Sequence, residues 1–166
     1  MKQTPTAPPV PDNFRRPLRL LVVDDSVGLL KSLCAYFETQ PLFQVVGTAM
    51  DGGEALHMAE LLEPDLVLMD LRMPVMDGLQ AMAILRRRVP NVRIVIMTME
   101  DSATAEAEAR AHGAHGFIWK TRIMSNLVTE LRRAFLSDHT KDESSSSPQD
   151  PTRTHATQGQ EGTTDQ

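Results

Sequence analysis

Short apolar runs alternate along the chain with longer segments in which apolar residues recur every three or four positions. The short runs are apolar almost throughout, whereas a strand with one face in water would alternate apolar and polar residues. We interpret them as strands of a parallel sheet that is covered on both faces. They span residues 19–24, 43–49, 65–70, 92–98 and 115–119.

The longer segments have the period of amphipathic helices. Asp51 and Glu54 have the spacing of a capping box, Asp77-Gly78 precedes another helix, and Thr121 is placed to cap the last one. The residues that we expect on the inward faces are Val27, Leu30, Cys34 and Phe37; Leu79, Met82 and Leu85; Ala103, Ala105, Ala107, Ala109 and Ala111; and Met124, Leu127, Leu131 and Phe135.

Five strand-helix units in succession predict a doubly wound α/β fold. In such a fold the ligand site lies beyond the carboxyl ends of the strands, where the strand order reverses. Polar residues stand at four of those ends: Asp24 and Asp25, Asp70, Thr98 and Lys120 follow or close the first, third, fourth and fifth strands.

Each of these residues taken alone has an ordinary explanation, because Asp and Thr often cap helices and Lys is usually a solvated surface charge. Together they predict an acidic pocket with a cationic wall. Three carboxylates repel one another, so a divalent cation is the natural counter-charge. Oxygen ligands alone favour Mg²⁺.

Composition defines the limits of the domain. A chain of 166 residues with 41% hydrophobic content can form one core. Residues 1–17 contain five prolines, and residues 137–166 contain one apolar side chain, Ala156. We expect both segments to be disordered and residues 18–136 to be the folded domain. The C-terminal segment has six acidic and two basic side chains, so it carries −4 of the chain's net charge of −5.

The sequence also indicates where the protein works. We expect it to be cytoplasmic and not bound to a membrane, since no apolar run approaches the roughly 20 residues of a membrane span and no signal peptide is recognisable. The single cysteine, Cys34, cannot form an intramolecular disulfide. The negative net charge argues against a general nucleic-acid surface.

Four stretches carry a family resemblance: "LLVVDDS", "DLVLMDLRMPVMDG", "IVIMT" and "GFIWK". In this order and spacing they resemble the receiver domain of two-component response regulators, over residues 18–136. The local sequence is most similar to receivers of NarL/LuxR-type regulators, although we expect this receiver to stand alone. The resemblance implies a CheY-like, flavodoxin-like three-layer (βα)5 fold with strand order 2-1-3-4-5.

The resemblance also implies a phosphorylation site. Asp70 would accept a phosphoryl group from the phosphohistidine of a sensor histidine kinase or a phosphotransfer protein. Mg²⁺ would be held by Asp24, Asp25, Asp70 and the backbone carbonyl of Arg72. The metal and Lys120 would neutralise the incoming charge. This transfer and the later autodephosphorylation are self-catalysed by a phosphoacceptor, so we do not expect an enzyme in the usual sense.

The phosphorylated state would be read at the surface. Thr98 would bind the phosphoryl group, Phe117 would change rotamer with it, and the surface of the fourth helix, fifth strand and fifth helix would change. Trp119 shares strand parity with Phe117 and is a candidate anchor for a partner, although plain edge-strand packing is the more ordinary explanation. We expect a downstream protein or a second copy as target, with no direct nucleic-acid binding.

The chain departs from the family pattern near the site. Thr121 follows Lys120 where the family usually has proline, and Met99 follows Thr98 where a small residue is usual. Arg72 and Glu100 stand two residues beyond Asp70 and Thr98. We expect either a gate in which they restrict the water that hydrolyses the phosphoryl group, or two solvated and uncoupled side chains.

Three other classes of protein place different requirements on the same residues. A haloacid-dehalogenase-like phosphatase needs an acid two residues after its nucleophile, where this chain has Arg72. A flavodoxin-like FMN carrier needs a phosphate cradle, where this chain has the acidic "DDSVG". A pseudo-receiver, which binds a partner independently of phosphorylation, stays open because of Met99 and Thr121.

Overall fold

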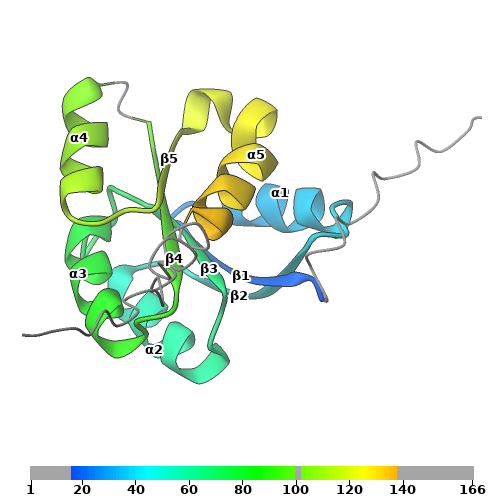
Figure 1. Ribbon diagram of the computed structural model, residues 1–166, viewed down its shortest axis with the longest axis horizontal. Helices are drawn as coiled ribbons and strands as arrows, with labels where there is room; N and C mark the ends of the chain where they lie inside the picture. The colour runs from blue at the N-terminus through cyan, green and yellow to red at the C-terminus, as the bar shows by residue number, and fades with distance from the viewer. Residues whose placement is uncertain (1–15, 100–101, 138–166) are drawn as a thin grey trace, which may run out of the picture.

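The chain forms one parallel sheet between two layers of helices (Figure 1). The structure, a computed structural model, describes residues 16–99 and 102–137. The strands lie in the order β2-β1-β3-β4-β5. They are β1 (Leu18–Val23), β2 (Phe43–Ala49), β3 (Leu66–Asp70), β4 (Arg93–Thr98) and β5 (Gly116–Trp119). This is the predicted doubly wound α/β fold, and the predicted strand order is confirmed.

Helices α1 and α5 cover one face of the sheet, and α2, α3 and α4 cover the other (Figure 1). Each face has its own core of apolar side chains. Every residue of β3 is buried, which explains why its sequence runs without a polar break until Asp70. The helices are α1 (Val27–Glu38), α2 (Gly52–Leu62), α3 (Gly78–Arg88), α4 (Ala103–Ala111) and α5 (Ile123–Leu136), with a 3-10 turn, η1 (Lys120–Arg122), before α5.

The predicted inward face of α1 was partly wrong. The helix buries Leu30, Leu33 and Phe37, whereas Cys34 is only half-buried and Val27 is 48% exposed. Steps of three and four residues connect the buried positions, so Cys34 falls on the flank of the buried stripe. Val27 is the first residue of the helix and lies three residues before the first buried position, Leu30.

Helix α4 was also predicted with too wide an inward face. Of its alanines only Ala105 and Ala109 are buried, and Ala103, Ala107 and Ala111 face solvent. A helix has 3.6 residues per turn, so residues two apart cannot share one narrow contact. Two methyl groups therefore provide the buried contact of this helix with the sheet.

The start of α5 differs from the prediction in two ways. Thr121 does not cap it, because the chain enters through η1 and the cap position is Arg122, which makes no side-chain capping bond. Ile123 is buried while Met124 is 51% exposed. The 3-10 turn rotates the first residues of the helix relative to the position that the periodicity predicts.

The helix caps on the opposite face follow the sequence more closely. Asp51 caps α2 by accepting a hydrogen bond from the Glu54 amide at 2.8 Å, but Glu54 accepts from the Met50 amide and so does not complete the box. The complete capping box is at α3, between Asp77 and Gln80. Among the described residues, no helix is long and apolar enough to cross a membrane.

The junction of β3 and α3 has no room for a side chain at Gly78. A methyl group there would collide with the Asp70 carbonyl oxygen and lie 3.0 Å from the Leu71 Cα, both of which are backbone atoms. The Gly78 amide also donates to the Leu71 carbonyl at 3.0 Å. The first turn of α3 is therefore packed directly against the end of the central strand.

We predict that Gly78→Ala lowers the free energy of unfolding by about 2 kcal/mol or more, because backbone atoms must move to admit the methyl group. The matched control is Gly28→Ala in the first turn of α1, where the nearest atom to an added methyl group is 4.0 Å away. That control should stabilise the protein by up to about 1 kcal/mol. Urea denaturation measures both, and equal effects would contradict the close packing at Gly78.

Candidate functional site

The predicted polar residues meet at the carboxyl end of the sheet. Asp24 and Asp25 follow β1, Asp70 closes β3, and Lys120 follows β5. Strand β1 lies between β2 and β3. The chain runs from β1 to β2 on one side and then crosses over β1 to reach β3 on the other side. The acidic residues therefore lie at the point where the strand order reverses, as expected for a doubly wound sheet.

The three carboxylates form one cluster. Each offers an oxygen, and these oxygens lie within 4.8 Å of one another. The Asp24 side chain is fully buried and Asp70 is 4% exposed, whereas Asp25 faces solvent. The Ser26 amide donates to Asp24 Oδ1 at 2.8 Å, which fixes the carboxylate at the start of α1.

Lys120 joins two of these carboxylates. Its Nζ lies 2.6 Å from Asp24 Oδ2 and 2.9 Å from Asp70 Oδ2, and its side chain is 10% exposed. The turn η1 therefore brings the ammonium group to the site with threonine in place of proline at position 121. The positive wall that the sequence predicted lies directly against the acidic pocket.

Burial and neighbouring charges shift the pKa values of Asp70 and Lys120. Burial raises the pKa of the Asp70 carboxyl, and the charge of Asp24 adds to this, while Lys120 opposes it without reversing it. For the Lys120 ammonium, burial alone would lower the pKa, but hydrogen bonds and charges from Asp24 and Asp70 outweigh burial and raise it. The pocket therefore favours a further positive charge beside Asp70.

The donor set fits a hard divalent cation. All three candidate ligands are carboxylates, which suit Mg²⁺. The buried Asp24 Oδ2 is paired with the Lys120 ammonium at 2.6 Å, but one ammonium group faces three carboxylates. A divalent cation at the cluster would compensate the remaining negative charge.

The predicted switch residues lie on the two strands beside this cluster. Thr98 ends β4 and is fully buried, and it pairs in register with Trp119 of β5. Phe117 and Trp119 both pack on the α4 side of the sheet, as their parity predicted. Their ring centroids are 5.5 Å apart, at an interplanar angle of 78°. The Trp119 side chain is only partly buried.

One residue of the predicted gate lies in the described part of the chain. Arg72 is exposed, and Glu100 lies outside the described residues. Met99, which stands where the family usually has a small residue, has 66% of its surface exposed.

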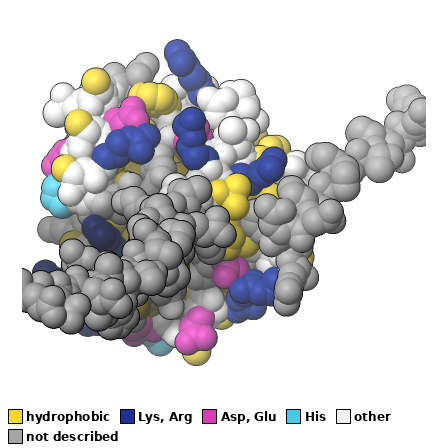
Figure 2. All heavy atoms as spheres, in the orientation of Figure 1, with side chains coloured by type: hydrophobic (Ala, Val, Ile, Leu, Met, Phe, Trp, Pro, Cys, Tyr) yellow, Lys and Arg dark blue, Asp and Glu magenta, His cyan; other side chains and the backbone are white. Residues whose placement is uncertain are grey.

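Sequence reasoning missed an apolar rim around the mouth of the pocket. We use "the rim" for Val27, Met50, Val75, Met99 and Met124, which are between 42% and 95% exposed and of which one follows each strand within six residues. Figure 2 shows apolar side chains at the surface at the end of the molecule where α4 and α5 begin. The signal was present, since each strand is followed within six residues by such a side chain.

Val75 is the most exposed member of the rim and has an uncommon backbone. Its φ is +69°, and the Met76 amide donates across it to the Pro74 carbonyl at 2.7 Å. This is a three-residue turn with a positive φ at its centre, which is rare and costly for a β-branched residue. The surrounding loop therefore holds an apolar side chain in solvent at a cost in backbone energy.

Comparison with known proteins agrees with the geometry. Residues 20–132 match the family model of the response regulator receiver domain. The chain is 41% identical over 110 residues to a protein-glutamate methylesterase/protein-glutamine glutaminase of Symbiobacterium thermophilum, covering 66% of this chain and 30% of that protein. It is 32% identical over 119 residues to response regulator protein VraR of Staphylococcus saprophyticus, covering 72% of this chain and 57% of VraR.

Solved structures give the same result. The response regulator domain of Thermotoga maritima CheB matches with a TM-score of 0.67 and 32% identity, over 72% of this chain and 97% of that one. The NarL receiver domain of Mycobacterium tuberculosis matches with a TM-score of 0.64 and 29% identity, over 76% of this chain and 98% of that one. The chain spans 30% and 57% of the lengths of the two curated relatives named above.

The family-model match covers the acidic loops that form the site. It begins within β1 and ends within α5, so it reaches all five strands. With the strand order and the cluster of three aspartates, it shows that the chain belongs to the response regulator receiver domain family.

Proposed function

We propose that the protein is a phosphorylation-dependent signalling switch whose phosphoacceptor is Asp70. The observation that carries this proposal is the Lys120 ammonium held between Asp24 and Asp70, at 2.6 and 2.9 Å from their oxygens. A carboxylate attacks phosphorus poorly while the incoming group is negatively charged. A buried ammonium beside the acceptor lowers this repulsion without having to be ordered during the reaction.

The phosphoryl group comes from a phosphohistidine of a histidine kinase or phosphotransfer protein. A carboxylate oxygen of Asp70 forms the new bond to phosphorus, the bond from phosphorus to the imidazole nitrogen breaks, and that nitrogen keeps the electron pair. Asp24, Asp25, Asp70 and the carbonyl of Arg72 would hold Mg²⁺, which when bound neutralises charge on the phosphoryl oxygens. The Lys120 ammonium then pairs with a phosphoryl oxygen in place of the Asp70 carboxylate.

The added charge is transmitted through β4 and β5. Thr98 closes β4 at the pocket, and it turns its hydroxyl to the phosphoryl group once this is attached. Phe117 then fills the space behind Thr98. Since Phe117 and Trp119 are in contact, the change reaches the surface of α4, β5 and α5, where a downstream protein or a second copy reads it.

A second candidate is a protein-interaction module that works without phosphorylation. The apolar rim favours it, because exposed apolar side chains gathered around one mouth are typical of binding surfaces. The complete set of acids with its lysine favours phosphorylation, so we rank this alternative second. The gate formed by Arg72 and Glu100 stays a prediction.

We predict that acetyl phosphate with Mg²⁺ adds the mass of one phosphoryl group to the wild-type chain and none to Asp70→Asn, because amide nitrogen and oxygen cannot replace the carboxylate nucleophile. Intact-mass spectrometry measures the product. The control is Asp51→Asn, which changes a half-buried capping carboxylate outside the acidic cluster and should be labelled like the wild type. An unlabelled wild type, or label that persists in Asp70→Asn, would exclude Asp70 as the phosphoacceptor.

We predict that Mg²⁺ stabilises the folded protein, because only the folded chain brings the three carboxylates together. At ten times its dissociation constant the gain should be about 1.4 kcal/mol, measured as a rise in Tm that EDTA reverses. Asp25→Asn should lose most of the gain, and Asp51→Asn should keep it. Equal gains in both variants would place the ion elsewhere on the protein.

We predict that Asp70→Asn stabilises the metal-free protein at neutral pH, because burial raises the pKa of the Asp70 carboxyl and makes its charged form costly in the folded state. The raised pKa of Asp70 means that the folded state binds a proton there more readily than the unfolded chain does. The advantage of the variant should therefore shrink as the pH falls through that raised pKa. Urea denaturation in EDTA at several pH values tests this, and an advantage that grows toward low pH would contradict it.

A further inference from the structure

Helix α1 has an exposed stripe beside the one that it buries. Val27, Lys31, Cys34 and Glu38 follow one another at spacings of four, three and four residues, so they lie on one side of the helix. Three of them are exposed and Cys34 is half-buried. This spacing is typical of a helix face that packs against a second helix. We call these four residues the outer stripe of α1.

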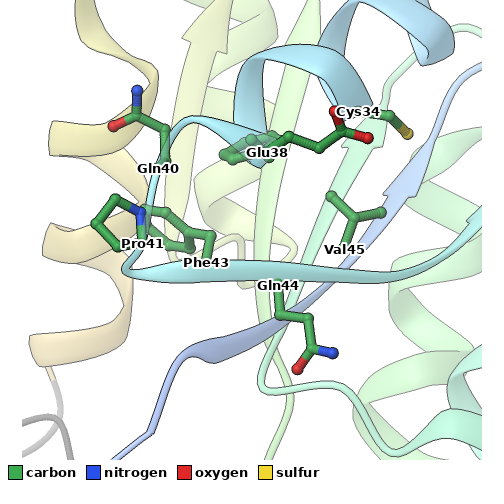
Figure 3. A pocket seen from close by; sticks show the side chains of 8 residues that line it. Cys34, Glu38, Gln40, Pro41, Phe43, Gln44 and Val45 are labelled. Carbon is green, nitrogen blue, oxygen red and sulfur yellow. The ribbon is translucent and has the colours of Figure 1, made fainter. Parts of the chain in front are cut away.

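Apolar hollows lie along the outer stripe, between α1 and the edge strand β2. A hollow of about 460 Å³ is lined by all four residues of the stripe and reaches Met50. A second hollow of about 380 Å³, which we call the aromatic hollow, is lined by Phe37, Pro41 and Phe43. Figure 3 shows Pro41 and Phe43 at one end of it and Cys34 toward the other. Apolar surface of this kind is stabilised when a partner covers it.

The two ends of this surface are complementary in shape. Val27 projects at the N-terminal end with 48% of its surface exposed, and the aromatic hollow opens at the C-terminal end. A two-fold axis that crosses α1 between Cys34 and Ala35 would place Val27 of each copy over the aromatic hollow of the other, since Val27 lies about 11 Å from that axis along the helix. Cys34 and Ala35 have small side chains, so two helices can approach closely there.

The charges of the outer stripe follow the same symmetry. Lys31 and Glu38 lie at equal distances on either side of this axis, so Lys31 of each copy comes opposite Glu38 of the other. Among the described residues, neither side chain forms a salt bridge within its own chain. The stripe is neutral as a whole, with one base and one acid. The remaining charged residue of the hollows, Glu54, already accepts a hydrogen bond from the Met50 amide at 2.8 Å.

We propose that the outer stripe is an interface between two copies of this chain, related by a two-fold axis between Cys34 and Ala35. Such an interface repeats every contact, so two pairs of Lys31 with Glu38 form together with two contacts of Val27. The interface lies at the β2 edge of the sheet, and β5 is the opposite edge. It is therefore distinct from the α4-β5-α5 surface of the proposed function, and the dimer does not require phosphorylation.

Charge reversal tests the pairing in the unphosphorylated full-length chain, with the molar mass measured by sedimentation equilibrium over a range of protein concentrations. The wild type should approach the mass of two chains as the concentration rises. Lys31→Glu alone or Glu38→Lys alone places like charges opposite each other and should raise the dimer dissociation constant about tenfold or more. The double variant restores opposite charges and should dimerise like the wild type. So should the control Arg87→Glu, at an exposed position of α3.

Cys34 gives a second readout, because it is the only cysteine in the chain and lies beside the proposed axis. A short bismaleimide should link two copies through Cys34 in the wild type and the double variant, and much less in either single variant. A wild type that stays monomeric at its solubility limit would overturn the proposal. So would single reversals that leave the dimer intact, or a double variant that stays monomeric. Acetyl phosphate labelling of the same samples reports the proposed function separately, because association is measured without a phosphodonor.

Discussion

One ammonium group holds two buried carboxylates close together, and the elements around them keep the three groups in position. Asp24 and Asp70 can approach each other at the end of a buried sheet because Lys120 lies between them. Removing charged groups from water is expensive, so the cluster persists only where neighbouring strands hold it rigidly. The apolar strands, the tight junction at Gly78 and the turn η1 together provide that rigidity. The remaining negative charge makes the pocket receptive to cations and phosphoryl groups.

The sheet could be predicted from the sequence because burial on both faces leaves a local signal, a run of apolar residues that ends at a polar one. Helix faces were less predictable. Periodicity locates the inward stripe of a helix to within about one residue. Only the position of the sheet decides that Leu33 is buried rather than Cys34, and that Ile123 is buried rather than Met124. Those outcomes depend on how each helix enters the layer, which at α5 is decided by a 3-10 turn.

The polar members of the site were predictable for a topological reason, since all parallel strands deliver their last residues to the same edge. The family resemblance supplied roles that topology alone does not distinguish, such as phosphoacceptor and metal ligand. The rim and the hollow between α1 and β2 were not predicted from the sequence. A methionine after a strand looks the same in sequence whether it is covered or exposed. The hollow between α1 and β2 depends on how the helix packs against the strand that follows it, which the sequence pattern does not report.

The two-alanine contact of α4 has a consequence for motion. Opening a helix locally costs roughly the burial and hydrogen bonds that it loses, and here the buried side chains are only the methyl groups of Ala105 and Ala109. A bulky residue at either position would add contact area and anchor the helix more firmly. With methyl groups alone, α4 exposes only a small part of the core on its face of the sheet when it opens. Among the described helices it is therefore the one that can open with the least loss of buried side chains.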